Sequence, residues 1–302
     1  MPVHALRSPH KFSLRPVWQL ARLLERERIE ILHTHLIQAD ILGFAAARLA
    51  TTPRVVSTKH NVRYYEGRQR WLRPLARQIE NRLDAVVAVS GAVAAEYGHA
   101  RRVEVIHNSV DVAKFTPSPL PASGPIVCLG KLTMQKGHRI LLEAVARLAK
   151  EFPNQRVEIA GTGPLIDDLQ ARAARLKLIR NVEFFGVVSD VRPLLARAAM
   201  IVMPSLWEGF GLAALEAMAC GRPVIASGVD GLREIITHER DGLLVPAGDV
   251  GALAEAIARL LRDRPLAERL AAAGRARVAE SFTLDTMARK LEALYASLSG
   301  TS

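Results

Sequence analysis

Apolar residues follow two alternating patterns along this chain. Residues 16–28 carry them at helical spacing, whereas residues 29–35, IEILHTH, form a short run with apolar residues at its start and two histidines at its end. The first pattern is typical of an amphipathic helix and the second of a buried strand. The alternation continues through most of the sequence. Because successive parallel strands need crossover connections, we expect parallel sheets and an α/β fold.

The expected elements form two consecutive series. The first domain covers residues 1–117, and residues 118–125, rich in Pro and Ser, follow as a linker. The second domain covers 126–282, and a C-terminal helix at 283–302 is expected to pack back toward the first. This order predicts two doubly wound, Rossmann-like domains facing a cleft, with ligands at the carboxyl ends of the strands. The strands are expected at 29–35, 54–60, 85–90, 103–110, 125–130, 156–161, 181–186, 200–205, 222–227 and 242–247.

Composition removes several protein classes. The longest apolar runs fall short of the roughly 18 residues that span a bilayer, and the basic, proline-containing start is unlike a signal peptide. Cys128 and Cys220, the two cysteines, lie inside apolar segments and exclude a disulfide framework. We therefore expect a cytoplasmic protein.

The net charge of +11 is unevenly distributed. Residues 1–118 hold 18 Lys and Arg against 10 Asp and Glu, a net +8, whereas the rest hold 23 against 20, a net +3. This asymmetry predicts an anionic partner for the first domain. A nucleic acid would rest on the basicity alone, because no binding motif is present, so we expect none.

A glycine-rich segment lies between an expected strand and an expected helix. Gly209 and Gly211 allow close backbone approach, and the amides where the helix begins near Leu212 favour an anion such as a diphosphate. Glu208 and Glu216 are eight residues apart, and their carboxylates can accept hydrogen bonds from sugar or ribose hydroxyls. Alternatively, Glu208 only complements the helix dipole and Glu216 is a solvated helix residue.

Two familiar nucleotide motifs do not apply. Residues 209–214 fit the dinucleotide pattern G-x-G-x-x-G/A, but they lie late in the second domain rather than in a first strand–helix turn. The P-loop pattern G-x-x-x-x-G-K-S/T is absent, and so is the Asp-x-Asp pair that bridges a metal to a diphosphate. Dehydrogenase and kinase activities are therefore not expected.

Two lysines lie in another loop between a strand and a helix. Lys131 and Lys136 follow Gly130, which ends an expected strand. Lysine is a compact cationic partner for phosphate. In isolation, two solvated loop lysines are the favoured interpretation, but the chain has only 8 lysines and these two share a strand's carboxyl end, which weakens that interpretation.

Three histidines end two expected strands of the first domain. They are His33, His35 and His60, and strand-end side chains of a parallel sheet face its ligand edge. A structural hydrogen-bonding role is the alternative. No carboxylate lies at ligand spacing from them, so we expect no metal site.

A basic run precedes the third expected strand. On a helix, the basic residues share one face and three apolar residues share another: Arg70, Arg73 and Arg77 against Leu72, Leu75 and Ile79. The simple interpretation is a core helix with a solvated basic face. The alternative is contact with anionic lipid headgroups or a phosphorylated acceptor.

Together these motifs resemble the family 4 retaining glycosyltransferases of the GT-B architecture. Glu208 to Glu216 is similar to the family's E-x7-E motif, and Gly130-Lys131 with Lys136-Gly137 resembles its donor-phosphate loop. Residues 105–115 are similar to the family's V-I-P-N-G-V-D…F segment, from which His107 and Ser109 depart. His60 and Ser90 match strand-end residues of the family's first domain.

The resemblance implies a role for each matched residue. Lys131 and Lys136 would neutralise the departing nucleoside diphosphate in place of a metal, and no cofactor would be needed. Glu208 would bind the transferred sugar, and Glu216 the ribose. The expected catalytic residues are His60, Lys136 and Glu208; the expected donor-binding residues also include Gly130, Lys131, Gly161, Val188, Gly209, Phe210, Gly211, Leu212 and Glu216.

One departure concerns the start of the chain. The family's first domain opens with a strand and a Gly-rich loop, whereas this chain starts with MPVHALRSPHKF. We therefore expect a truncated N-terminal domain that lacks its first strand–helix unit. The leading hypothesis is metal-independent, retaining transfer from a UDP- or GDP-sugar to a glycan or lipid-linked acceptor in envelope polysaccharide synthesis, at the inner membrane face. The alternative is a non-catalytic nucleotide-sugar-binding remnant.

Overall fold

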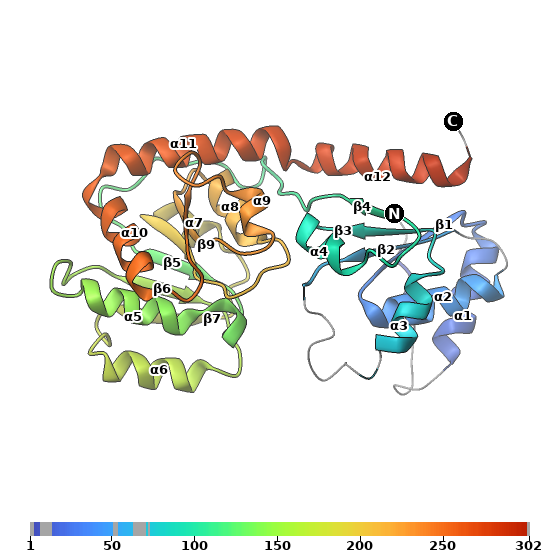
Figure 1. Cartoon of the computed structure of the whole chain (residues 1–302), viewed down its shortest axis with the longest axis horizontal. Helices are drawn as coiled ribbons and strands as arrows, with labels where there is room; N and C mark the ends of the chain where they lie inside the picture. The colour runs from blue at the N-terminus through green and yellow to red at the C-terminus, as the bar shows by residue number, and fades with distance from the viewer. Residues whose placement is uncertain (1–2, 7–13, 51–53, 63–70, 72, 301–302) are drawn as a thin grey trace. The chain divides into compact units, whose positions relative to one another are not determined.

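The computed structural model describes residues 3–6, 14–50, 54–62, 71 and 73–300 (Figure 1). These residues fall into two compact units. The first unit comprises Met1–His107 together with Ala288–Ser302, and the second comprises Asn108–Met287. The chain thus leaves the first unit, builds the second and contributes its last helical segment to the first.

The first unit contains a four-stranded parallel sheet. Its strands lie in chain order: β1 (Ile31–His35), β2 (Arg54–Lys59), β3 (Ala85–Ala88) and β4 (Val103–Val105). Within the sheet, His33 of β1 lies beside Val56 of β2 and His35 beside Thr58. Because side chains alternate between the two faces of a strand, this register sends the histidines to one face and Thr34 and Lys59 to the other.

Helices cover this sheet, and the amphipathic pattern explains the first of them. The helices are α1 (Arg15–Arg26), α2 (Ile37–Leu49), α3 (Arg73–Glu80) and α4 (Gly91–Glu96). The apolar stripe of α1, with Val17, Ala21 and Leu24, packs against Ala46 of α2 and the neighbouring Ala50. The last helix, α12 (Leu284–Ser299), donates the Tyr295 ring to the histidine side of the first unit.

The second unit contains a six-stranded parallel sheet in the order β7-β6-β5-β8-β9-β10. Numbered within this unit, the order is 3-2-1-4-5-6, which is that of a Rossmann fold. The strands are β5 (Ile126–Leu129), β6 (Val157–Ala160), β7 (Val182–Gly186), β8 (Met200–Met203), β9 (Val224–Ser227) and β10 (Leu243–Val245).

Two groups of helices enclose this second sheet. In one group α5 (His138–Leu148) contacts α6 (Ile166–Arg175) and α10 (Val250–Arg262). In the other, α8 (Leu212–Ala219) contacts α9 (Leu232–Ile235) and α11 (Arg264–Ser281). The inner strands β5, β6, β8 and β9 are wholly buried, which explains why they appear in the sequence as mostly apolar runs, whereas the edge strand β7 is only partly buried. The predicted pair of Rossmann-like α/β domains is confirmed.

Some of the short helices are not apparent from the sequence. Besides α4 and α9, a single 3-10 turn, η2 (Met134–Lys136), lies between β5 and α5, and α7 (Arg192–Arg197) precedes β8. Of these segments, α4, α9 and η2 were not predicted. A helix of one or two turns shows too few residues to reveal a hydrophobic period.

Candidate active site

Loops at the carboxyl ends of the second sheet approach one another at glycines. A Cβ atom on Gly161, which follows β6, would lie 1.9 Å from the carbonyl oxygen of Gly130, which follows β5. A Cβ atom on Gly137 would lie equally close, 1.9 Å, to the carbonyl oxygen of Pro204 after β8. All three glycines also have positive φ angles. Glycine is therefore required for these loops to pack at the strand ends.

The Lys136 ammonium group forms an ion pair with the Glu208 carboxylate. Ser205 donates a hydrogen bond to the same Glu208 oxygen at 3.4 Å. The Lys136 side chain is 22% exposed and that of Glu208 11% exposed. Limited access of water strengthens the attraction between the two charges. Two predicted catalytic residues, 72 positions apart in the chain, are thus in direct contact.

The main chain of Glu208 is held by the loop that follows β9. Its amide donates to the Asp230 carboxylate at 3.1 Å, and its carbonyl accepts from the Gly231 amide at 3.2 Å. Sequence analysis did not identify Asp230, because only the fold brings it to Glu208. It also assigned no role to Ser205, which lies three residues before Glu208.

The helix after the glycine-rich loop presents its amino terminus at the same sheet edge. Gly211, with φ of 113°, precedes α8, and no side chain caps that end of the helix. Such an N-terminus favours an anion. The Phe210 ring is buried against Phe282 at a centroid distance of 5.9 Å, so only its main chain can face a ligand. Leu212 is half exposed, at 48%.

The other predicted donor-binding residues are more dispersed. Lys131 is exposed in the β5–α5 loop, and Val188 is half-buried in the loop after β7. Glu216 is half-buried on α8, where burial raises the pKa of its carboxyl group and the nearby Lys114 opposes that rise. The ion pair joins Lys136 and Glu208, while Lys131, Val188 and Glu216 lie on separate loops or helices around the same sheet edge.

His138, the first residue of α5, is buried beside the lysine loop. It is 1% exposed, and among the described residues neither ring nitrogen has a hydrogen-bond partner. Burial, followed by the charge of Lys136, lowers its pKa to about 4. The imidazole is therefore neutral at pH 7.

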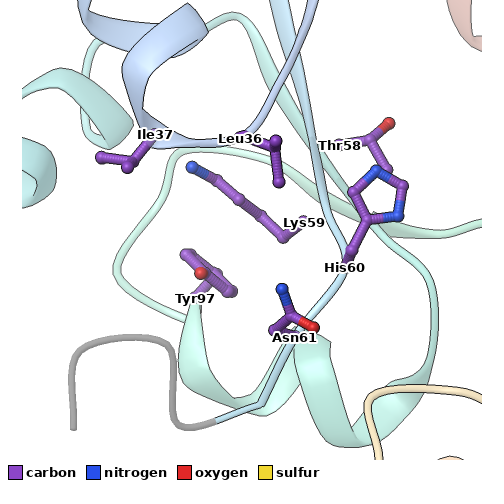
Figure 2. A pocket seen from close by; sticks show the side chains of 7 residues that line it. All are labelled: Leu36, Ile37, Thr58, Lys59, His60, Asn61 and Tyr97. Atoms are coloured by element: carbon purple, nitrogen blue, oxygen red, sulfur yellow. The ribbon is translucent and has the colours of Figure 1, made fainter. Parts of the chain in front are cut away.

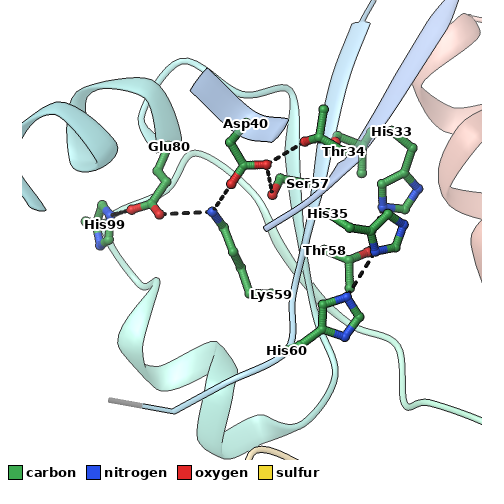
Figure 3. A network of polar contacts seen from close by, with 11 residues as sticks. His33, Thr34, His35, Asp40, Ser57, Thr58, Lys59, His60, Glu80 and His99 are labelled. Carbon is green, nitrogen blue, oxygen red and sulfur yellow. Dashed lines mark hydrogen bonds and ion pairs between the residues drawn. The ribbon is translucent and has the colours of Figure 1, made fainter. Parts of the chain in front are cut away.

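The three predicted histidines of the first unit form a connected row (Figure 3). His35 Nδ1 lies 3.0 Å from His60 Nε2, and the rings of His33 and His35 stack at 4.8 Å. His33 contacts the Tyr295 hydroxyl at 2.5 Å and the Thr58 hydroxyl at 2.6 Å. Burial, followed by the charge of His35, lowers the pKa of both His33, to about 4, and His60.

A buried charged network occupies the opposite face of β1 and β2, as Figure 3 shows. Lys59 Nζ lies 2.6 Å from Asp40 and 3.0 Å from Glu80, and both carboxylates are fully buried. Thr34 and Ser57 donate to Asp40 at 2.6 and 2.7 Å. Buried charges require such partners. Two sequence signals point to this network: Asp40 is the one acidic residue of α2, and Lys59 ends a buried strand.

A small pocket opens between this network and the histidine row (Figure 2). Lys59 and Tyr97 border it on one side and His60 on the other. The residues that line it are Leu36, Ile37, Thr58, Lys59, His60, Asn61 and Tyr97.

Ser90, which matches a strand-end residue of the family, does not line this pocket. It is buried as the N-cap of α4, where its hydroxyl accepts a hydrogen bond from the Val93 amide.

The predicted basic face is partly described. Arg73 and Arg77 are exposed on α3, whereas Arg70 and Leu72 lie outside the described residues. Leu75 was expected on the buried face with Ile79, but it is 46% exposed while Ile79 is buried. This expectation is wrong because α3 turns its short buried stripe, Ala76, Ile79 and Glu80, toward the core.

Two features are absent from the described residues. None of their helices combines the length and apolarity needed to cross a bilayer. They also contain no group of three or more His, Cys, Asp or Glu side chains placed to hold one metal ion.

Two Rossmann-like units, with a lysine–glutamate ion pair at the strand ends of the second, are the arrangement expected of a GT-B enzyme, and comparison with known families supports this class. Residues 121–277 match the family of glycosyl transferases group 1, and residues 1–114 match glycosyltransferase family 4. The chain belongs to the family 4 glycosyltransferases, enzymes of the hexosyltransferase type. The family and fold inferred from the sequence motifs are confirmed.

Individual proteins show the same relationship. A GDP-mannose-dependent α-(1-6)-phosphatidylinositol monomannoside mannosyltransferase of Mycobacterium tuberculosis is 32% identical over 90% of this chain and 77% of its own length. A UDP-Gal:α-D-GlcNAc-diphosphoundecaprenol α-1,3-galactosyltransferase of Escherichia coli is 28% identical over 84% of this chain and 72% of its own. The crystal structure of Anabaena HepE with UDP and glucose superposes with a TM-score of 0.85, 23% identity and coverage of 93% and 81%.

Proposed function

We propose that this protein transfers a hexose from a UDP- or GDP-sugar to a glycan or lipid-linked acceptor, with retention of configuration and without a catalytic metal. The contact between Lys136 and Glu208 carries the proposal. Lys136 is a cation that can pair with a phosphate, and the Glu208 carboxylate can accept hydrogen bonds from sugar hydroxyls. Both lie beside a helix N-terminus that no side chain caps.

The physical reason lies in where charge develops. When the bond between the sugar and the diphosphate breaks, negative charge grows on the leaving diphosphate. Lys136 and the α8 amides are fixed by the fold, so they stabilise that charge without rearranging. Lys131 adds a second cation from the same loop. Glu208 then holds the sugar hydroxyls, and Glu216 the ribose.

The remaining assignments depend on resemblance and on the relatives' names. The family resemblance gives His60 a hydrogen bond to the transferred sugar. The relatives' names include a UDP-sugar and a GDP-mannose donor, and both name a lipid acceptor. We therefore propose a cytoplasmic enzyme that works at the inner face of the cell membrane in envelope glycan synthesis.

Ligand-dependent stability tests the donor site first. The purified chain is heated with UDP, GDP, UDP-galactose or GDP-mannose, with and without EDTA. A ligand at about 100 times its dissociation constant stabilises a protein by about 2.7 kcal/mol, which is a rise of a few degrees here. We expect the ligands of one base, uracil or guanine, to raise the melting temperature by the same amount with and without EDTA. Glu216→Ala is expected to abolish that rise. No rise with any of the four would contradict the proposal.

Turnover tests the chemistry. Radiolabelled hexose from the stabilising donor is followed into a lipid extract of bacterial membranes. Lys136→Ala and Glu208→Ala are expected to lower transfer about 100-fold or more, because each removes a group that stabilises the transition state. Lys150→Ala, an exposed lysine of the same unit, serves as the matched control. Donor binding without transfer in the unaltered protein would instead support a nucleotide-sugar-binding remnant.

A further inference from the structure

Asp230 has a backbone conformation that side chains rarely adopt. It lies between β9 and α9 with a φ angle of 35°, in the left-handed region that favours glycine. A non-glycine residue in this region costs free energy, and such residues persist where the surroundings or a function retain them. The question is what an aspartate supplies here that glycine would not.

The Asp230 carboxylate supplies a hydrogen-bond acceptor for the segment that contains Glu208. Asp230 Oδ2 accepts the Glu208 amide hydrogen at 3.1 Å. The next residue, Gly231, donates its own amide to the Glu208 carbonyl at 3.2 Å. One short loop therefore holds the peptide groups on both sides of Glu208.

The two loops are also in tight steric contact. A Cβ atom on Gly231 would lie 2.5 Å from the carbonyl oxygen of Gly209, and one on Gly211 would lie 2.6 Å from the Leu232 side chain. The backbone of residues 208–211 thus has little room to move independently of residues 230–232. A change at Asp230 is transmitted directly to Glu208.

The Glu208 side chain is held from elsewhere. Lys136 pairs with its carboxylate, and Ser205 donates to it at 3.4 Å. Loss of the Asp230 carboxylate would leave these side-chain contacts in place but free the Glu208 amide. The effect should therefore concern the direction of the carboxylate more than the integrity of the fold.

We infer that Asp230 is a positioning residue of the donor site: its carboxylate fixes the main chain of Glu208, so that the Glu208 carboxylate meets the sugar hydroxyls of the nucleotide-sugar. The strained backbone is retained because glycine has no acceptor to offer. This inference rests on the proposed role of Glu208.

Three variants separate the carboxylate from the backbone strain. Asp230→Ala keeps the strain and removes the acceptor, Asp230→Gly removes both, and Asp230→Asn keeps an acceptor oxygen. Calorimetric titration compares UDP-galactose with UDP and GDP-mannose with GDP. We expect Asp230→Ala and Asp230→Gly to lower the affinity for the nucleotide-sugar about fivefold to tenfold, which corresponds to the loss of one hydrogen bond. The affinity for the nucleoside diphosphate should change less than about twofold. Asn should stay close to the unaltered protein.

Stability should change in a different order. The melting temperature is expected to fall in Asp230→Ala and to equal or exceed that of the unaltered protein in Asp230→Gly. Lys177→Gly is the matched control, since Lys177 is exposed, follows α6 and has a φ of 61°. That substitution should raise the melting temperature and leave every affinity unchanged.

Glu208→Gln distinguishes a failure of the proposed Glu208 role from a failure of the inference about Asp230. If it leaves the advantage of nucleotide-sugar over nucleoside diphosphate intact, the proposed role of Glu208 fails and this inference fails with it. If Glu208→Gln removes that advantage while Asp230→Ala and Asp230→Gly preserve it, only the inference is overturned. Equal losses for nucleotide-sugar and diphosphate in the Asp230 variants would also overturn it, because they indicate a purely structural role.

Discussion

At the scale of single residues, burial decides which side chains carry charge. His138 and His33 each have a pKa near 4 because burial penalises the imidazolium ion. In the unfolded chain a histidine titrates near pH 6.5. Between these values the unfolded chain binds more protons than the folded one, so stability decreases as the pH falls from about 6.5 toward 4.

His138 offers a direct test of this linkage. We expect the free energy of unfolding of the second unit to fall between pH 7 and pH 5, with His138 contributing about 2 kcal/mol of that fall. His138→Leu should remove its share, because leucine cannot take up the proton. Urea unfolding followed by Trp207 fluorescence, with Trp18 and Trp71 replaced by Phe, measures this.

The control for this prediction is His4→Gln, which alters an exposed histidine of the first unit. It should leave the pH dependence of the second unit unchanged. An equal pH dependence with and without His138 would show that the buried imidazole finds a partner when it is protonated.

At the scale of elements, the site depends on a close backbone approach between the ends of neighbouring strands, which leaves no room for a Cβ atom. Gly130 and Gly161 end the neighbouring strands β5 and β6, and the chain turns away from both with positive φ. This close approach places the lysine loop over the sheet edge. A glycine at such a position therefore serves two purposes, conformation and space.

Comparison of two glycines separates these purposes. Gly161 and Gly248 both have positive φ, but a Cβ atom would meet the Gly130 carbonyl oxygen at 1.9 Å in the first case and nothing within 4 Å in the second. Gly248→Ala should cost about 1–2 kcal/mol, the conformational penalty alone. Gly161→Ala should cost about 3 kcal/mol or more, since the backbone must also shift. Urea unfolding measures both, and equal costs would contradict the close approach.

At the scale of the whole molecule, positive charge gathers in the first part of the sequence. Residues 1–118 carry a net +8 of the total +11. On α3, Arg73 and Arg77 are exposed beside Leu75, and Trp71, just before the helix, is 74% exposed. Cations next to exposed apolar and aromatic side chains are typical of surfaces that bind anionic membranes.

Vesicle flotation tests this membrane proposal. The protein is expected to float with phosphatidylglycerol vesicles, less so with phosphatidylcholine vesicles, and less at high salt, which screens the attraction. Arg73→Gln with Arg77→Gln should reduce flotation. The control, Arg175→Gln with Arg180→Gln, removes the same charge from exposed positions of the second unit. Equal flotation of both double variants would assign binding to net charge rather than to α3.

Much of the fold could be predicted, because each long element carries its own pattern. The stripe of α1 and the buried runs of β5, β6, β8 and β9 appear directly in the sequence. By contrast, the exposure of Leu75 depends on how α3 meets the core, and the turns α4, α9 and η2 are too short for a period. The site was predicted in the same uneven way: Lys136 and Glu208 were identified from local motifs, whereas Asp230 and Ser205 carry no motif.

The sequence by itself determined the class of fold, the family and the chemical groups of the candidate site, because apolar periodicity and loop motifs are local properties. Only the tertiary structure decided which of those groups meet. It paired Lys136 with Glu208, brought the Asp230 carboxylate within hydrogen-bond distance of the Glu208 amide, and buried Lys59 between Asp40 and Glu80. The physical reason is that these contacts link residues from separate strand–helix units, and their spacing is set by the sheet rather than by the chain between them.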